Sequence, residues 1–559
     1  MKRNIFTLAC LLGLAPVAMA QTFGGGSGIE TDPYLITTVD QLQDIQNSRL
    51  GQVAGTYFRL ENDLDLMGVE WNPIQAFVAN FDGNGKTITN LTISSGNNGV
   101  GLFSSANTPG VISNLTLRDA SVTAGNWSAV LVGTNGNWER GGATIQNCKL
   151  YNATITGADC IGVIAGVCTG DIDGCEVYNG TVTATGNNGT GGIVGRCEST
   201  GAHYVANCLY QGTVAGQQWV GGIVGFSQYN DGNIPAISNN AFYGTVSANG
   251  EAAAGIVAYQ QGQTNVTITN NMAIGEVTAA NGPGLLTGNP IDGKIDGNFA
   301  IGNVTQNGDG TWAGGINATQ YQYTKNCYFA GNVTGATHCG AITGRPWGAV
   351  THCVWDKELM ANGLGEWQTD TYVSDGRIKG LTSDEMKASL SNYIFEDLAK
   401  WQIIEGKTTA FFANQTAPVE VTNAYLNCAE GTYQGQAPVL YAYDNNGPIE
   451  ILNCQVQDGK WIIEWDLEMA AGAPRRAQAT TGQVNIIAKT SGMMPSMLTT
   501  ATITPEVYTA IDNVVTNKEV AQVTYFNMAG MSSSRAFDGV NIVVTRYTDG
   551  TTTAAKVMK

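Results

Sequence analysis

Three tryptophans stand at matching places in a repeated pattern and are the strongest candidates for contact with a ligand. Trp127, Trp219 and Trp312 each come three residues before a short run of glycine and aliphatic residues. Flat aromatic side chains with Asn and Gln beside them are a common surface for sugars. The alternative interpretation is that each tryptophan covers a corner of the hydrophobic core.

The acidic residues of the repeated region stand singly. Enzymes that cleave polysaccharides need carboxylates or strong bases gathered on one face. No pair of carboxylates returns here at the spacing of the repeat, as two catalytic groups would. The sequence therefore predicts no catalytic residue. Examples of these single acidic residues are Asp171, Asp173, Glu176, Glu198 and Glu276.

Histidine could supply metal ligands at two places only. The three histidines are His203, His338 and His352, and the last two each precede a cysteine. His338-Cys339 and His352-Cys353 could together provide four ligands for zinc. Successive side chains of a strand face opposite sides, however, so His352 points away from the side that Cys353 faces. We therefore predict no metal site and no cofactor.

The elements that position these residues belong to a pattern that returns nine times between Gly99 and Trp355. Its plainest copies are Gly191-Gly192-Ile193-Val194-Gly195 and Gly221-Gly222-Ile223-Val224-Gly225. Self-similarity at a regular interval is the mark of a repeat protein. Successive copies are 25 to 33 residues apart, and the weaker ones begin at Gly101, Val130, Gly162, Gly255, Gly284, Gly315 and Gly340.

Each repeat contains three short apolar segments separated by Gly, Asn, Asp, Ser and Thr. Segments of three to five residues suit strands and are too brief for helices. Three strands and three turns make one coil of a parallel β-helix, and coils must stack to bury their inner faces. The expected fold is therefore all-β, a right-handed parallel β-helix of about nine coils, with the hand given by the usual crossover rule.

One position in each repeat, two or three residues after an aliphatic residue, is Cys or Asn. Stacked coils would place these residues over one another as a ladder of small side chains, whose central amides can bond to each other. Neighbouring cysteines could form disulfides in an oxidising compartment or remain as buried thiols. The ladder consists of Cys148, Cys175, Cys208, Asn240, Asn271, Asn298, Cys327 and Cys353.

The first twenty residues have the pattern of a secretory signal peptide. Lys2 and Arg3 precede an apolar run, and Ala18-Met19-Ala20 is a cleavage site, so the mature chain is expected to begin at Gln21. No later apolar run approaches the roughly 20 residues that a membrane span needs. The sequence predicts a protein that is secreted or displayed at the cell surface.

Residues 21–98 depart from the repeat and are expected to close the first end of the core. Thr38 can cap a short helix at its beginning. Asp63, Asp65 and Asp82 alternate with apolar residues, so they either face water or bind calcium.

After Trp355 the repeat stops, and residues 356–414 are expected to close the other end of the core. Thr382 and Glu385 form a capping box that opens a helix there.

The third region, residues 415–510, has the pattern of antiparallel strands. A hairpin at Asp458-Gly459 joins two of these strands. The pattern predicts a small Ig-like β-sandwich over residues 415–510, with an exposed loop at residues 470–476.

The repeats resemble the GLUG motif of bacterial surface proteins, which is named for a Gly-Leu-aromatic-Gly core. Gly101-Leu102-Phe103-Ser104 is a near copy, and the Gly-Gly-Ile-Val-Gly copies are the common variant. The resemblance covers about half of the chain. Some GLUG repeats belong to immunoglobulin A-specific metallopeptidases, but no His-Glu-x-x-His motif occurs here, so the resemblance does not imply that activity.

The last fifty residues contain Asn527-Met528-Ala529-Gly530, Gly539-Val540-Asn541-Ile542-Val543 and a terminal Lys556-Val557-Met558-Lys559. With these elements, residues 511–559 resemble the C-terminal sorting domain of Bacteroidetes proteins that are exported by the type IX secretion system. The resemblance implies a contact with the secretion machinery and attachment at the outer face of the outer membrane. Such tails also occur where that system is absent.

Composition limits the classes of partner. The chain has 72 Gly in 559 residues, 13% charged residues and a net charge of -18. A surface this acidic argues against DNA, RNA or anionic membranes as partners. The leading hypothesis is a non-enzymatic adhesin or binding scaffold for a glycan or a host protein. The alternatives are a polysaccharide-active lyase or hydrolase and a structural component of a surface layer.

Overall fold

The chain forms two compact units in the computed structural model. The first unit contains residues 1–416 and 489–498, and the second contains residues 417–488 and 499–559. The predicted signal peptide and the predicted loop at residues 470–476 lie outside the described residues. The structure describes residues 23–137, 141–199, 203–229, 236–262, 267–290, 293–366, 374–424, 428–433, 438–444, 447–457, 459–466, 483–503, 520–527, 531–537, 539–548 and 552–558.

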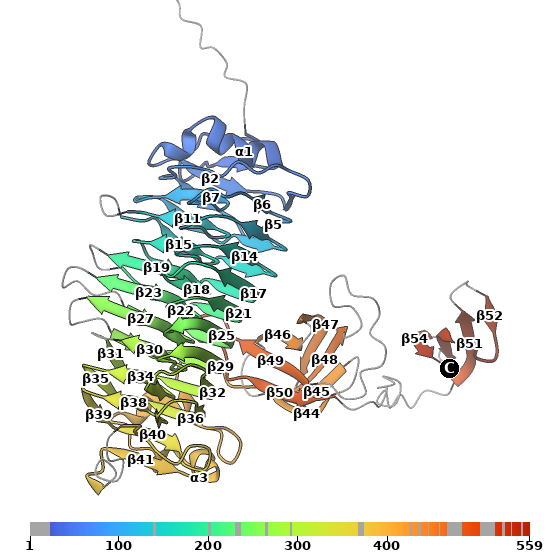
Figure 1. Cartoon of the computed structure of the whole chain (residues 1–559). Helices are drawn as coiled ribbons and strands as arrows, with labels where there is room; N and C mark the ends of the chain where they lie inside the picture. The colour runs from blue at the N-terminus through green and yellow to red at the C-terminus, as the bar shows by residue number, and fades with distance from the viewer. Residues whose placement is uncertain are drawn as a thin grey trace, which may run out of the picture. The chain divides into compact units, whose positions relative to one another are not determined.

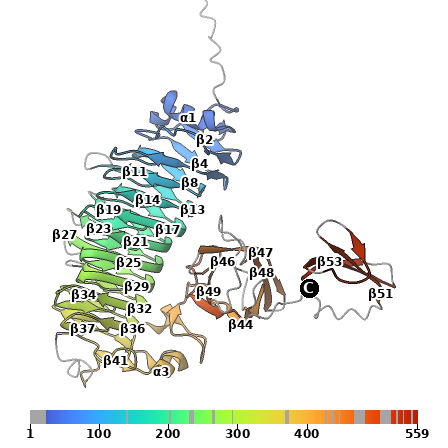
Figure 2. The same cartoon turned by 45° about the vertical axis from the view of Figure 1, so that its right-hand side comes forward.

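The first unit is a rod of three parallel sheets, to which successive turns of the chain contribute strands in the same order (Figures 1 and 2). Ile145, for example, pairs with Ile112 of the preceding turn and Ile172 of the next. All three of these side chains are fully buried. The predicted all-β parallel β-helix of about nine coils is confirmed.

The first sheet has twelve strands. They are β1 (Tyr34–Ile36), β2 (Tyr57–Leu60), β4 (Asn80–Asp82), β8 (Val111–Ser113), β12 (Thr144–Gln146), β16 (Ile172–Asp173), β20 (Val205–Ala206), β24 (Ala236–Ser238), β28 (Thr267–Thr269), β31 (Lys294–Asp296), β35 (Tyr323–Lys325) and β39 (Ala349–Thr351).

The second sheet has fifteen strands. They are β3 (Leu64–Asp65), β5 (Thr87–Thr89), β6 (Thr92–Ser94), β9 (Thr116–Arg118), β10 (Ser121–Thr123), β13 (Lys149–Tyr151), β14 (Thr154–Gly157), β17 (Glu176–Ala184), β21 (Leu209–Gly216), β25 (Ala241–Glu251), β29 (Met272–Asn281), β32 (Phe299–Gln306), β36 (Tyr328–Thr334), β40 (Cys353–Asp356) and β41 (Ile378–Leu381).

The third sheet has nine strands, and short strands precede it in several turns. Its members are β7 (Phe103–Ala106), β11 (Val132–Asn135), β15 (Ala165–Cys168), β19 (Val194–Ser199), β23 (Val224–Tyr229), β27 (Val257–Gly262), β30 (Thr287–Pro290), β34 (Asn317–Gln320) and β38 (Thr343–Pro346); the short strands are β18 (Thr190–Gly191), β22 (Val220–Gly221), β26 (Ala253–Ala254), β33 (Trp312–Gly314) and β37 (His338–Gly340).

The corner between the first and second sheets is one residue in the left-handed conformation, followed by the Cys or Asn of the predicted ladder. Asparagine tolerates this conformation better than most residues that carry a Cβ atom. His352 takes the same place in the last turn, with φ 54°. The asparagines that precede a ladder residue have φ between 52° and 56° and are Asn147, Asn207, Asn239, Asn270 and Asn326.

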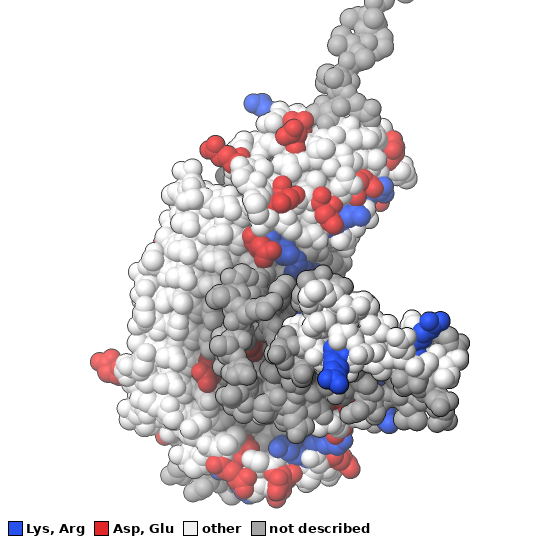
Figure 3. Space-filling model, turned by 90° about the vertical axis from the view of Figure 1, so that its right-hand side faces the viewer, with Lys and Arg blue, Asp and Glu red and all other residues white. Residues whose placement is uncertain are grey.

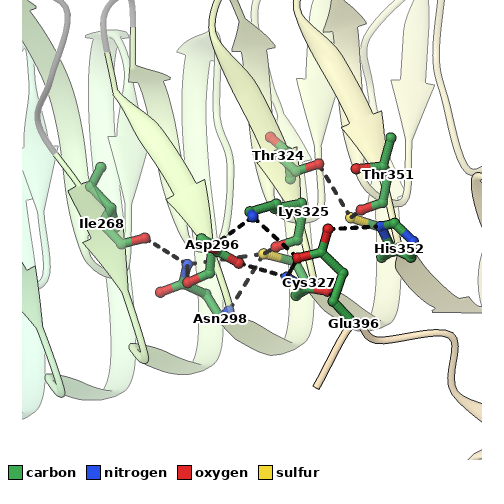
Figure 4. Close-up of polar contacts among 11 residues, drawn as sticks. Ile268, Asp296, Asn298, Thr324, Lys325, Cys327, Thr351, His352 and Glu396 are labelled. Atoms are coloured by element: carbon green, nitrogen blue, oxygen red, sulfur yellow. Dashed lines mark hydrogen bonds and ion pairs between the residues drawn. The ribbon is translucent and has the colours of Figure 1, made fainter. Parts of the chain in front are cut away.

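The ladder residues bond to backbone groups inside the core. The Asn271 side-chain nitrogen donates to Ile237 O (2.8 Å) and to Asn298 Oδ1 (3.0 Å), while Asn271 Oδ1 accepts from the Asn240 backbone nitrogen (3.0 Å). The predicted bonds between stacked amides are confirmed. Cysteines in the same slot donate to a carbonyl two residues earlier, as Cys327 does to Lys325 O (3.1 Å; Figure 4). Both residue types can therefore fill the slot.

A second bend lies within the second sheet, where later turns place glycine. Gly212, Gly244, Gly275 and Gly302 pair with one another in register and have φ between 138° and 150°. A Cβ atom on Gly244 would lie 1.9 Å from Gly212 O, so no other residue fits between the stacked backbones. The stacked glycines divide the outer face of the second sheet into two strips, one on each side of the bend.

Residues 23–98, at the first end of the rod, contain the predicted helix, α1 (Val39–Asn47), followed by η1 (Leu50–Gln52). Thr38 Oγ1 accepts from the Gln41 backbone nitrogen (3.3 Å), and Leu42 and Ile45 are buried. The three aspartates considered for calcium accept hydrogen bonds across turns. Their donors are the Thr87 backbone nitrogen for Asp63, the Asn90 amide for Asp65 and the Asn114 amide for Asp82.

The exit end adds β41 to the second sheet and then the predicted helix, α3 (Ser383–Ala388). Both bonds of the capping box are present, from the Glu385 backbone nitrogen to Thr382 Oγ1 (3.1 Å) and from the Thr382 backbone nitrogen to Glu385 Oε2 (2.8 Å). The short elements η2 (Leu390–Asn392), η3 (Leu398–Lys400), β42 (Trp401–Gln402) and β43 (Phe411–Phe412) follow.

Part of the outer face of the second sheet is apolar and fully buried. Tyr243, Phe299 and Tyr328 point away from the core of the rod. Phe412 packs on Phe299 with ring centroids 5.0 Å apart, and the Tyr243 hydroxyl donates to Ser496 O (2.6 Å). The chain beyond the exit end therefore covers this strip. Lys489–Leu498, which was expected within the sandwich, is part of this cover.

An ion-pair network holds the cover near the exit end (Figure 4). Glu396 lies 3.1 Å from Lys325 Nζ and 3.5 Å from His352 Nδ1, and it accepts from the Asn326 amide (3.1 Å). The Asn326 hydrogen bond and Lys325 lower the pKa of Glu396. The Glu396 hydrogen bond in turn raises the pKa of Lys325. His352 thus faces the cover, while Cys353 is buried.

A second, buried ion pair joins Lys489 to the rod. The Glu176 side chain is 6% exposed and contacts Lys149 Nζ (3.2 Å), Lys489 Nζ and the Tyr178 hydroxyl (3.2 Å). Burial alone would raise the pKa of Glu176, but Lys489 and Lys149 outweigh it and lower the pKa.

The second unit contains two antiparallel sheets. The seven-stranded sheet has the order β44-β45-β48-β47-β46-β49-β50, and Trp461 and Trp465 lie in its core. The predicted hairpin is present between β47 and β48, although Asp458 itself lies outside the described residues. The strands are β44 (Glu420–Ala424), β45 (Cys428–Thr432), β46 (Val439–Asp444), β47 (Gly447–Gln457), β48 (Lys460–Asp466), β49 (Gln483–Lys489) and β50 (Thr499–Thr502).

A separate four-stranded sheet lies in the predicted sorting region. It has the order β52-β51-β53-β54. None of the helices in the described residues is both long and apolar enough to cross a membrane. The predicted domain limits stay predictions. The strands are β51 (Val520–Asn527), β52 (Ser532–Ser533), β53 (Val540–Tyr547) and β54 (Thr552–Met558).

The substitution Asn271→Ala tests the ladder. It should lower the free energy of unfolding by about 2–3 kcal/mol, because buried backbone groups lose their partners. Asn271→Cys should cost less, since cysteine fills the same slot in other turns. The exposed control Asn97→Ala should change stability by no more than about 0.5 kcal/mol. Denaturant melts of the four proteins provide the measurement, and equal losses for the two alanine variants would contradict the role of the ladder.

The substitution Glu176→Gln tests the buried ion pair. Because the folded pKa of Glu176 is lowered, its contribution to stability is present above its unfolded pKa of about 4.3 and is lost as the pH falls through the folded pKa. The variant should therefore be less stable than the parent at pH 7, and the difference should shrink in acid. Thermal melts from neutral to acidic pH measure it, with the exposed Glu70→Gln as control. A difference that does not change with pH would argue against the ion pair.

Candidate functional site

The three predicted tryptophans occupy one corner position, just before the third sheet. Trp219 stands two residues before Gly221 of β22, and Trp312 stands two residues before Gly314 of β33. Trp127 and Trp219 share a left-handed φ of 58° and 54°. They belong to coils that are three apart. At about 4.8 Å per coil, each is roughly 14 Å from the next along the rod. The structure therefore aligns them but does not bring them together.

Trp219 packs among other aromatic side chains. Its ring stacks between Phe226 and Tyr259, with centroids 4.7 and 4.9 Å away. Arg196 covers the Phe226 ring at 4.8 Å from its centroid. The Trp219 ring thus has aromatic neighbours on both sides, and its contact with a ligand stays a prediction. Trp127 differs, because its side chain is 48% exposed.

Trp312 belongs to a cluster near the exit end that the sequence did not reveal. The Arg345 guanidinium lies 4.1 Å from the centroid of the Trp312 ring and 4.1 Å from that of Trp347. Glu366 Oε2 accepts from the Trp312 indole nitrogen (3.0 Å) and lies 3.1 Å from Arg345 Nε. One arginine thus contacts both rings, and one carboxylate holds the arginine and Trp312.

Trp347 and Tyr321 are the exposed aromatic members of the cluster. Trp347 is 53% exposed and Tyr321 is 39% exposed. Their rings meet edge to face, with centroids 4.9 Å apart and planes at 62°. We call Trp312, Tyr321, Arg345, Trp347 and Glu366 the aromatic platform.

The stacking of turns places these side chains. Gln320 pairs with Pro346, so the next residues, Tyr321 and Trp347, meet on adjacent turns. The backbone nitrogens of Trp347 and Gly348 both donate to Gln320 O (2.8 Å each). The same pairing sets Arg345 over Thr319, on the outward side of the third sheet. Both exposed rings are therefore carried by a rigid backbone.

The platform combines two exposed aromatic rings with one ion pair. Exposed ring faces offer a flat apolar surface, and Arg345 and Glu366 are already paired with each other. Among the described residues, no three His, Cys, Asp or Glu side chains gather as a metal site would require. Thr319 and Asn289 hydrogen-bond to each other beside Arg345 and add polar groups to the rim.

Four of the single acidic residues of the repeats have partners in the structure. Asp171 lies 3.1 Å from His203 Nδ1, and Asp173 accepts from the Asn207 amide (2.6 Å). Glu198 pairs with Arg196, and Glu176 with two lysines. Glu276 is exposed and makes no hydrogen bond or ion pair to any described residue.

Comparisons with known proteins identify limited regions of likeness. No protein-family model matches the chain. Over 190 residues, 31% of its length, the chain is 33% identical to halomucin of Haloquadratum walsbyi, of which it covers 2%. Over 144 residues, 24% of its length, it is 31% identical to a candidate Gly-rich membrane protein of Evansella cellulosilytica, of which it covers 16%. The chain thus spans only a small part of each relative.

One solved structure is also similar, that of a candidate immunoglobulin A1 protease from Bacteroides ovatus. It covers 70% of this chain and 95% of its own, with 18% sequence identity and a TM-score of 0.37.

Proposed function

We propose that this protein is an exported, non-enzymatic binding scaffold that holds a glycan on the aromatic platform. The observation that carries the proposal is the exposure of Trp347 and Tyr321 on adjacent turns, with Trp347 held against Arg345. Rings that are already ordered lose little conformational entropy when a ligand binds. A sugar ring has an apolar face that packs on an aromatic ring, and its hydroxyls bond to polar neighbours.

The chemistry of the platform favours a glycan over a charged polymer. Arg345 is its one cation, and Glu366 neutralises it at 3.1 Å. An anionic ligand would also meet a chain of net charge -18. A protein ligand would require a larger apolar patch than two half-exposed rings provide.

The proposed cellular location rests on residues 1–20 and 511–559. The predicted signal peptide and the resemblance of residues 511–559 to a sorting domain support export to the cell surface. The likeness to halomucin and to a candidate membrane protein is consistent with that location. The GLUG resemblance points to the same class of surface protein.

The substitutions Trp347→Ala and Tyr321→Ala test the platform. Each should weaken glycan binding by about tenfold or more, because a truncated aromatic anchor typically costs about 1–3 kcal/mol. Trp127→Ala is the matched control, since it removes an exposed tryptophan of the same rod that is not in the platform. Binding of the mature chain to immobilised mannan, xylan and laminarin provides the measurement.

The same assay separates the alternatives. Loss of binding in Trp127→Ala and not in Trp347→Ala would contradict the platform. Release of sugar fragments that depends on a single Asp or Glu would instead identify a polysaccharide-active enzyme. Self-assembly of the purified chain without binding to any of the polysaccharides would identify a surface-layer component.

Deletion of residues 511–559 tests the proposed address. The strands of this region pair only with one another among the described residues, so the melting temperature of the rod should hardly change. The shortened protein should remain in the periplasm, while the full chain reaches the surface or the medium. Cell fractionation measures the location. Equal surface display of both proteins would show that the region is not a signal.

A further inference from the structure

The second sheet presents two exposed ranks of hydroxyl side chains. Beyond the bend, each strand has one buried aliphatic residue with one outward-facing residue before it and one after it. The pairing register stacks these outward-facing residues over nine turns. Fourteen of the eighteen side chains are Thr or Ser. The first rank is Thr92, Ser121, Thr154, Thr181, Thr213, Thr245, Glu276, Asn303 and Asn332; the second is Ser94, Thr123, Thr156, Thr183, Ala215, Ser247, Thr278, Thr305 and Thr334.

The last three turns differ from the others. The first rank changes from hydroxyls to Glu276, Asn303 and Asn332, and a groove of about 290 Å³ opens along them. Thr278, Thr305 and Thr334 form its other side. The groove is close to the lower limit of size for small-molecule sites in proteins.

Three polar side chains of the groove lack a hydrogen-bond partner among the residues that the structure describes. Elsewhere on the rod, amides bridge neighbouring turns, as Asn207 does to Asp173 (2.6 Å) and Asn326 to Asp296 (2.8 Å). The side chains of Glu276, Asn303 and Asn332 make no hydrogen bond to a described residue, although they stack in register. Their donors and acceptors are therefore available to a ligand.

The charge of this surface limits the ligand. Glu276 is the one acidic or basic side chain among the eighteen positions of the two ranks. Figure 3 shows charged side chains gathered toward the two ends of the rod, while the visible strip between them, drawn mostly in white, carries few. A carboxylate without a neighbouring cation repels phosphate, sulfate and uronic acids. It accepts hydrogen bonds from neutral hydroxyls, and each amide both donates and accepts.

We propose that the groove of Glu276, Asn303 and Asn332 is a second glycan site, which takes an extended chain of neutral sugars lying along the rod. The proposal rests on the proposed function in that the ligand is a glycan, but the site is on a different sheet from the aromatic platform. Vicinal hydroxyls of one sugar meet the carboxylate or an amide, and the adjacent turn offers the next polar group about 4.8 Å further along. No aromatic residue lines this groove.

The test uses the mature chain carrying Trp347→Ala, so that the platform contributes little. Calorimetry with neutral manno-, xylo- and laminari-oligosaccharides, and with oligogalacturonate of equal length, measures binding. Asn303→Ala and Asn332→Ala should each weaken binding of a neutral oligosaccharide by about fivefold, the usual effect of one lost hydrogen bond. Glu276→Gln should weaken it similarly and should also allow oligogalacturonate to bind.

Thr154→Ala and Thr123→Ala are the matched controls, because they lie in the same ranks outside the groove and should have no effect. All five sites are on the surface, so the melting temperature should not change. If the groove variants leave neutral-sugar binding unaltered, or oligogalacturonate binds the unsubstituted groove, this inference fails and the platform stands. If no oligosaccharide binds any form of the protein, both proposals fail.

Discussion

Register between turns is the constraint on which the rest of the rod depends, and the buried Cys and Asn ladder sets it. At each corner the chain turns through one left-handed residue, and the next side chain bonds to backbone carbonyls of its own and the neighbouring turn, as Asn271 does to Ile237 O. A slip of one residue would send every apolar side chain of the following strand to the wrong face. The small side chains of the ladder therefore fix the register in which successive turns stack.

Exact register gives the surface its properties. Residues from distant parts of the sequence line up on the outside, so a pair such as Tyr321 and Trp347 meets although 26 residues separate them. The same rule produces the ranks of hydroxyls and the change to Glu276, Asn303 and Asn332. A functional site on this fold is thus a set of equivalent positions in consecutive turns, held by backbone that the core keeps in place.

The repeats, the ladder and both cap helices could be predicted, because each leaves a local signal in composition or spacing. The common corner of Trp127, Trp219 and Trp312 could be found for the same reason, but their surroundings could not. Trp219 is stacked between Phe226 and Tyr259, and Trp312 lies against Arg345. These contacts depend on how far each side chain reaches toward the neighbouring turns. Alignment of Gln320-Tyr321 with Pro346-Trp347 would have revealed the exposed pair. The cover formed by Lys489–Leu498 had no signal, since it comes from a segment more than 130 residues beyond the last repeat.

Hydrogen–deuterium exchange of the mature chain, with and without a neutral polysaccharide that it binds, tests the central claim that a rigid rod presents the ligand site on adjacent turns. Amides of the stacked strands should exchange slowly in both states, because their bonds open only with the fold. Added ligand should slow exchange further in the peptides that contain Tyr321 and Trp347. Rapid exchange throughout residues 99–355 would contradict the rod. Protection that appears only in residues 417–488 would show that the ligand binds outside it.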